Sequence, residues 1–186
     1  MAGSIFADLK ESVTGQEVHG IEFLSVIEEE RSENGVRLSV RHKETSGHPT
    51  SLKLDLSFRE LPLAKPILKP ILNPYGYDLP TCEIHAMALD EMLAEKVRAL
   101  IARGAPRDVY DVWFLLRNDV RFNGGFIAAK LKVLKRDNVF ETALFLSRVE
   151  EKREEWKRDL NPLLMQVPDF DQIRHDIEKA ISAIGT

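Results

Sequence analysis

Hydrophobic and polar positions alternate along three segments in the first third of the chain. Residues Ile21–Glu30, Val36–Lys43 and Ser51–Phe58 carry an apolar side chain at about every second position, the period of a strand with one buried face. Asn34-Gly35 is typical of a two-residue type I′ turn, whose central residues take positive φ. The pattern predicts an antiparallel meander. The predicted faces are Ile21, Phe23, Ser25 and Ile27 in the first strand, and the core-facing Leu52, Leu54, Leu56 and Phe58 in the third.

Apolar residues recur at helical spacing at the N-terminus and through most of the second half of the chain. Five prolines between residues 62 and 80 predict an irregular segment, and Cys82–Ala88 predicts a short strand. These patterns predict an α+β fold, with a small antiparallel sheet in residues 1–88 and a helical bundle in residues 89–186 packed on it. Besides a hairpin at Leu89–Leu116, the predicted helices are Ser4–Val13, one after Gly124-Gly125, Val139–Asp159 and Asp169–Ile184.

Residues Leu89–Leu116 predict two helices joined by a tight turn. Gly104 is suited to the positive φ that is common just after a helix ends. Pro106 prevents the first helix from continuing, and Asp108 is suited to the start of the second. Antiparallel helices with so short a connection pack side by side.

Charged side chains are predicted on the facing sides of these two helices. Lys96 and Arg103 share one face of the first helix, beside an apolar stripe where a charge is costly unless it is paired. Asp108 and Asp111 are placed to meet them from the second helix. Either ion pairs lock the hairpin, or the cations hold nucleotide phosphates while the aspartates orient them. The spacing supports both interpretations equally.

The charge of the chain is distributed unevenly. The 186 residues have a formal net charge of −4, but Lys96–Arg136 contains ten basic and three acidic residues and is therefore +7. Such a local excess suits a phosphate-binding surface. A solvated basic face without a ligand is the equal alternative.

Other features of the sequence limit the class of protein. Cys82 is the single cysteine, which excludes a disulfide within the chain and fits a reducing cytosol. No apolar run approaches the roughly 20 residues that span a bilayer, and the N-terminus lacks the features of a signal peptide. We find no Walker loop, dinucleotide fingerprint or Ser-His-Asp order. A cytoplasmic protein with no membrane partner is predicted.

Asp55 is a candidate for chemistry on the sheet. It lies on the polar face of the most regular predicted strand, between Lys53 and Ser57. A strand holds a carboxylate rigidly enough to bind a divalent cation or to act as a base. The alternative is an exposed surface aspartate without a role.

The predicted hairpin resembles a known family. Its sequence from Ala88 to Leu116, ALDEMLAEKVRALIARGAPRDVYDVWFLL, is similar to the nucleotidyltransferase-like AbiEii/AbiGii toxin family. In that family a helix ending in Lys-x-x-Ala-x-x-x-Arg precedes Arg-Asp-x-x-Asp and an aromatic-rich helix. The strand LKLDLSF, which contains Asp55, also fits. The matching hairpin positions are Lys96, Ala99, Arg103, Arg107, Asp108 and Asp111.

The resemblance implies a reaction and its partners. A nucleotidyl group would pass from an NTP to an RNA 3′ end, with a tRNA-like acceptor as one candidate and Mg²⁺ as cofactor. The protein would belong to a toxin–antitoxin or phage-defence system and would have a cognate antitoxin. The implied site residues are Asp55 as catalytic carboxylate and metal ligand, Lys96, Asp108 and Asp111 as catalytic residues, and Lys96, Arg103 and Arg107 as nucleotide-binding residues.

One element of the family pattern is not visible. Full-length members begin with a Gly-Ser helix and a strand bearing an Asp-x-Asp pair, the principal metal ligands, and nothing before Asp55 offers such a pair. We therefore expect a truncated or degenerate member, a misassigned start, or one half of a split enzyme. The alternative function is a non-catalytic RNA- or protein-binding module that retains the basic hairpin.

Overall fold

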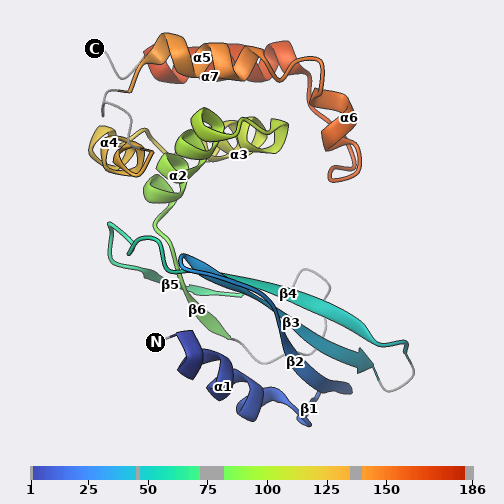
Figure 1. The fold of residues 1–186 in the computed structure, drawn as a ribbon. Helices are drawn as coiled ribbons and strands as arrows, with labels where there is room; N and C mark the ends of the chain where they lie inside the picture. The colour runs from blue at the N-terminus through green and yellow to red at the C-terminus, as the bar shows by residue number, and fades with distance from the viewer. Residues whose placement is uncertain (1, 45–46, 72–81, 135–139, 183–186) are drawn as a thin grey trace. The chain divides into compact units, whose positions relative to one another are not determined.

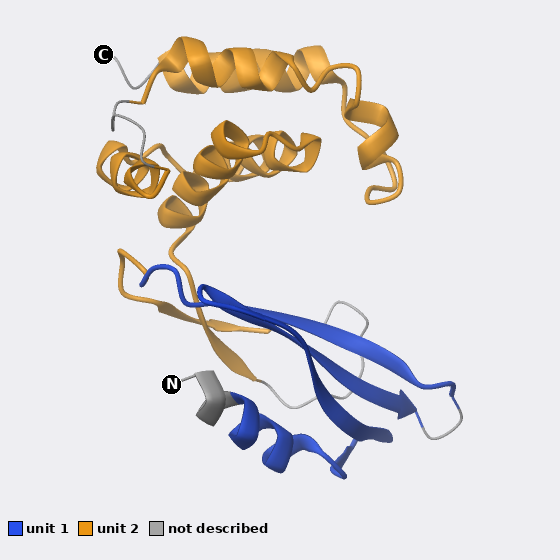
Figure 2. Cartoon of the chain, in the orientation of Figure 1, with its two compact units in different colours: residues 1–61 blue, residues 62–186 orange. Residues whose placement is uncertain are grey.

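The chain divides into two compact units, Met1–Leu61 and Pro62–Thr186 (Figures 1 and 2). The computed structural model describes residues 2–44, 47–71, 82–134 and 140–182. A mixed α+β fold is confirmed, because the first unit contains an antiparallel four-stranded sheet and the second consists mainly of helices. The predicted boundary between residues 88 and 89 stays a prediction.

The first unit is a meander covered by one helix. The sheet has the strand order β1-β2-β3-β4, and every neighbouring pair is antiparallel. The N-terminal helix lies along the sheet (Figure 1) and contributes Phe6, Leu9 and Val13 to a core centred on Leu38. The three predicted strands and this helix are confirmed. Their bounds are α1 Ala2–Val13, β1 Glu17–Val18, β2 Ile21–Ser32, β3 Gly35–Glu44 and β4 Thr50–Ser57.

The predicted burial of the strands is partly wrong. A register shift in β2 between Phe23 and Ser25 interrupts the alternation, as an inserted bulge residue does, so Phe23 and the buried Val26 pack on one core while Ile27 is 44% exposed. Leu52 of β4 is 54% exposed, and Phe58, which follows the end of β4, is 42% exposed. In the described part of the chain β4 pairs with β3 alone, so it forms an edge of the sheet.

The β2–β3 hairpin is confirmed, but its turn is centred one residue earlier than predicted. Ser32 pairs with Gly35, which leaves Glu33 and Asn34 as the loop, and neither Asn34 nor Gly35 has a positive φ. Gly35 is required for another reason. A Cβ atom at this position would lie 2.5 Å from the carbonyl oxygen of Leu56, so only glycine allows β4 to approach so closely.

The second unit joins a two-stranded ribbon to a helical core. The ribbon is β5 paired antiparallel with β6. Helices α2 and α3 form the predicted hairpin, and α5 lies beside α7 (Figure 1). No helix of the described residues is long and apolar enough to cross a bilayer. The element bounds are β5 Ile67–Pro70, β6 Glu83–Ala86, α2 Leu89–Ala102, α3 Pro106–Arg117, α4 Gly124–Lys132, α5 Thr142–Glu150, α6 Trp156–Leu160 and α7 Phe170–Ser182.

Two predictions in this unit are wrong in part. The proline-rich segment contains β5, although residues 72–80 of that segment lie outside the described residues. The long helix predicted from Val139 to Asp159 is interrupted, because α5 ends at Glu150 and turns lead into α6 at Trp156. No glycine or proline lies in that interval to signal the break. Val139 and the end of the last predicted helix lie outside the described residues.

Candidate active site

The turn between α2 and α3 is held by a side-chain clamp. Gly104 takes a φ of +61° directly after α2, as predicted, and Pro106 is the first residue of α3. Arg103 donates from Nε and Nη2 to the two carboxylate oxygens of Asp108 at 3.0 and 2.9 Å. The side chain of Asp108 is fully buried and also accepts the backbone N–H of Ala105. The hydrogen bonds that Arg103 donates to Asp108 raise the pKa of Arg103.

A second ion pair joins the two helices further from the turn. Lys96 Nζ lies 2.5 Å from Asp111 Oδ2, and the two side chains are 31% and 35% exposed. Lys96 and Arg103 therefore each form an ion pair with one of the two aspartates, as predicted. They differ in access, because the Asp108 carboxylate is out of contact with solvent whereas Lys96 and Asp111 are reachable from it. Arg107 is exposed on the first turn of α3.

Removing the clamp should destabilise the fold. Replacing Arg103 by alanine leaves the buried Asp108 carboxylate with one weak donor, and we expect the free energy of unfolding to fall by about 1–3 kcal/mol. Urea denaturation measures this loss. Arg107→Ala is the matched control, with an expected change below about 0.5 kcal/mol. Equal stability of the two variants would show that the clamp is dispensable.

Asp55 lies in the first unit and is engaged by an arginine. Its Oδ1 accepts Arg37 Nε at 2.6 Å, and its side chain is 69% exposed. Arg37 also contacts Glu30 through Nη1 at 3.2 Å. The strand position of Asp55 opposite Arg37 follows from the β3–β4 register, so this pair belongs to the polar face of the sheet.

The described residues do not fit a divalent ion. Mg²⁺ requires several oxygen ligands in near-octahedral geometry, and no group of three His, Cys, Asp or Glu side chains among the described residues could hold a metal. The nearest charged partner of Asp55 is the guanidinium of Arg37, which repels a cation. The role of Asp55 as a metal ligand stays a prediction.

A buried ion pair on α2 escaped sequence reasoning. Lys130 of α4 is 1% exposed, and its Nζ lies 2.9 Å from Glu91 and 3.1 Å from Glu95. The backbone N–H groups of Leu63 and Ala64 also donate to the Glu91 carboxylate, at 2.8 and 2.9 Å. Burial acts to raise the pKa of Glu91, but these hydrogen bonds outweigh it and lower the pKa below its usual value. Lys130 therefore does not belong to the basic surface in which the charge count placed it.

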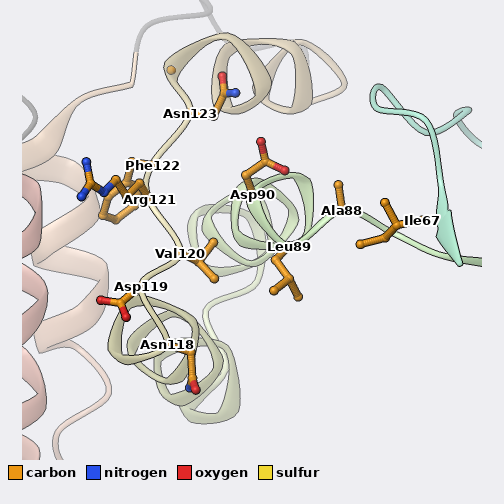
Figure 3. A pocket seen from close by; sticks show the side chains of 11 residues that line it. Ile67, Ala88, Leu89, Asp90, Asn118, Asp119, Val120, Arg121, Phe122 and Asn123 are labelled. Atoms are coloured by element: carbon orange, nitrogen blue, oxygen red, sulfur yellow. The ribbon is translucent and has the colours of Figure 1, made fainter. Parts of the chain in front are cut away.

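A pocket of about 840 Å³ lies beside the first turn of α2. Figure 3 shows Asp90 from α2, Asn123 before α4 and Ile67 of β5 around it. Its polar groups are largely engaged by the backbone. Asp90 accepts the N–H of Glu91, Asn123 accepts the N–H of Phe126, and the amide of Asn118 donates to a carbonyl of α3. None of the site residues predicted from the sequence lines this pocket.

Comparison with one solved structure supports the fold. MenT4, a nucleotidyltransferase toxin from Mycobacterium tuberculosis, superposes with a TM-score of 0.63 at 22% sequence identity, covering 95% of this chain and 63% of its own. JHP933 from Helicobacter pylori matches with a TM-score of 0.49 at 16% identity, covering 90% of this chain and 66% of that one. The chain thus spans just under two thirds of the length of these two proteins. No curated protein sequence matches the chain.

The family of the protein is identified from its amino-acid sequence. Residues 5–181 match the family of nucleotidyl transferase AbiEii toxins of type IV toxin–antitoxin systems. The match includes both β4 with Asp55 and the α2–α3 hairpin with its two ion pairs. The chain belongs to the AbiEii family of nucleotidyl transferase toxins.

Proposed function

We propose that this protein takes part in the transfer of a nucleotidyl group from an NTP to the 3′ end of an RNA in the cytoplasm, as the toxin of a toxin–antitoxin or phage-defence pair. A cognate antitoxin protein would restrain it. The family supports the reaction class. The observation that carries the assignment to particular residues is the half-exposed Lys96–Asp111 pair on the α2–α3 hairpin.

Lys96 would contact the triphosphate directly. An ammonium group has three N–H donors, and Asp111 accepts from only one side of it. The remaining donors can bind phosphate oxygens, and the developing negative charge of the leaving pyrophosphate would be stabilised by a cation already oriented by Asp111. Arg107, exposed on the first turn of α3, would add a second phosphate contact with its planar fork.

Arg103 and Asp108 would act by holding the turn that presents Arg107. Their mutual hydrogen bonds occupy both oxygens of the buried carboxylate, which leaves Asp108 poorly placed to accept a proton from a substrate. The side chain of Arg103 is 55% exposed, so its guanidinium can still attract a phosphate. Asp55 would serve as the sheet carboxylate, and Mg²⁺ would be the cofactor of the reaction.

A labelling experiment tests the assignment. The purified protein, incubated with Mg²⁺, each radiolabelled NTP in turn and total tRNA, is expected to label the RNA at its 3′ end. Lys96→Ala should lower the labelling rate by about 100-fold. The control is Lys132→Ala, an exposed lysine on α4, which should leave the rate unchanged. Equal rates for the two variants would remove Lys96 from the site.

A second candidate function is an RNA-binding module without turnover. It is favoured by the lack of a metal-binding group among the described residues. RNA binding that weakens steeply with salt, together with no labelling by any NTP, would support this function over nucleotidyl transfer.

A further inference from the structure

One face of α3 carries an aromatic stack, in which Phe114 is exposed and Tyr110 is half-buried against the helical core. The rings of Tyr110 and Phe114 are stacked, with centroids 6.1 Å apart and planes 23° from parallel. Phe114 is 51% exposed, whereas the neighbouring Trp113 is only 7% exposed. Among the described residues, Phe58 on the sheet unit is the other exposed aromatic side chain. The buried side of α3 is formed by other residues, so the Phe114 ring is accessible to a ligand.

Cations flank the stack at both ends. Arg107 precedes Tyr110 by three residues and Phe114 by seven, a spacing that puts all three on one helix face. Arg117 follows Phe114 by three residues and places its guanidinium 5.1 Å from the centroid of the Trp113 ring. The face thus offers flat apolar surface between positive charges.

The acidic residues near this face are already engaged by other side chains. Asp111 lies three residues before Phe114 and is paired with Lys96 of α2. Asp176 of α7 accepts the indole N–H of Trp113 at 2.9 Å and lies close enough to Arg117 for their charges to interact. Three cations therefore face two carboxylates around the stack, and the remaining positive charge is complementary to a polyanion.

We infer that this face binds the unpaired end of the acceptor RNA, with one base stacked on Phe114 and Tyr110 and the flanking phosphates bound by Arg107 and Arg117. Unpaired bases stack on aromatic side chains while the backbone follows cationic groups. Within a base-paired duplex both faces of each base are covered by its neighbours, and the side chains of an acidic peptide have no ring to stack on Phe114. The inference deepens the proposed function and rests on it for the identity of the RNA as acceptor.

Fluorescence anisotropy with a short unpaired RNA tests the inference without NTP or turnover. Phe114→Leu keeps an apolar side chain but removes the ring, and we expect the affinity to fall by about 5- to 100-fold. Phe58→Leu, the matched control on the other unit, should leave the affinity unchanged. Arg107→Ala should weaken binding of every sequence and reduce the slope of log affinity against log salt by about 1.

Three results would overturn the inference. They are equal RNA affinity of Phe114→Leu and the unchanged protein, equal affinity for an abasic oligonucleotide of the same length, and an equal loss of poly-glutamate binding in Phe114→Leu. The folded state of Phe114→Leu is checked by thermal unfolding, which should match that of the unchanged protein because the ring is exposed. If Phe114→Leu weakens RNA binding but no NTP labels the RNA at its 3′ end, the proposed function alone is refuted. If the RNA is labelled but Phe114→Leu binds it as tightly as the unchanged protein does, this inference alone is refuted.

Discussion

Replacing Lys130 by methionine is expected to lower the free energy of unfolding by about 3 kcal/mol. Glu91 and Lys130 are both buried and lie 2.9 Å apart, so methionine would leave the Glu91 carboxylate without its cation inside the helical unit. Two backbone N–H groups would still donate to Glu91. Because these two donors remain, we expect the loss of unfolding free energy to lie at the lower end of the range for a broken buried ion pair.

Urea denaturation followed by far-UV circular dichroism measures this loss. The control is Lys132→Met, because Lys132 lies on the same helix and is exposed, and its effect should stay within about 0.5 kcal/mol. Adding Glu91→Gln to Lys130→Met should restore part of the stability, because the double variant no longer buries a carboxylate. A loss in Lys130→Met no larger than that in Lys132→Met would mean that water reaches the pair.

Replacing Trp156 by alanine should cost about 3–5 kcal/mol of unfolding free energy. Trp156 is 1% exposed, packs edge-on against Phe170 with ring centroids 5.3 Å apart, and donates from Nε1 to the carbonyl of Pro168 at 2.9 Å. Alanine removes the ring and the hydrogen bond together. It therefore loosens the junction of the short helix α6 with the start of α7.

Trp156→Phe separates the two contributions. Phenylalanine fills most of the space but cannot donate, so the expected loss is only about 1–2 kcal/mol. Thermal unfolding should be followed by circular dichroism, because tryptophan fluorescence changes with the substitution itself. If Trp156→Ala proved no less stable than Trp156→Phe, packing around the indole would not be a principal source of stability.

Local patterns sufficed for most elements of the fold. The alternation in β3 and β4, the helical stripe of α2 and the Gly104 turn each depend on residues close in sequence. The pairs Lys96–Asp111 and Arg103–Asp108 were accessible for the same reason, since a tight hairpin brings its own residues together. Whether these pairs bind phosphate depends on a ligand, which local patterns do not reveal.

The predictions of burial and of helix bounds were wrong where contacts between residues distant in the sequence determine the structure. Lys130 has the sequence neighbours of a surface lysine, and only the packing of α4 on α2 reveals a buried partner. The bulge in β2 shifts its faces through pairing with β3. The break after α5 has no glycine or proline to cause it, and it precedes Trp156, whose ring packs against Phe170 of a later helix. The exposed stack on α3 was visible only as an aromatic-rich helix.

The edge position of β4 has a consequence for the behaviour of the protein in solution. An unpaired strand edge offers N–H and C=O groups to any other extended chain and is a common starting point for aggregation. The exposed Leu52 increases that tendency. Lys53 and Asp55, both charged and on the polar side of the same strand, oppose it as gatekeepers, since adding a further strand would desolvate them. These two ion-paired side chains therefore protect the solubility of the sheet unit, whatever part Asp55 has in chemistry.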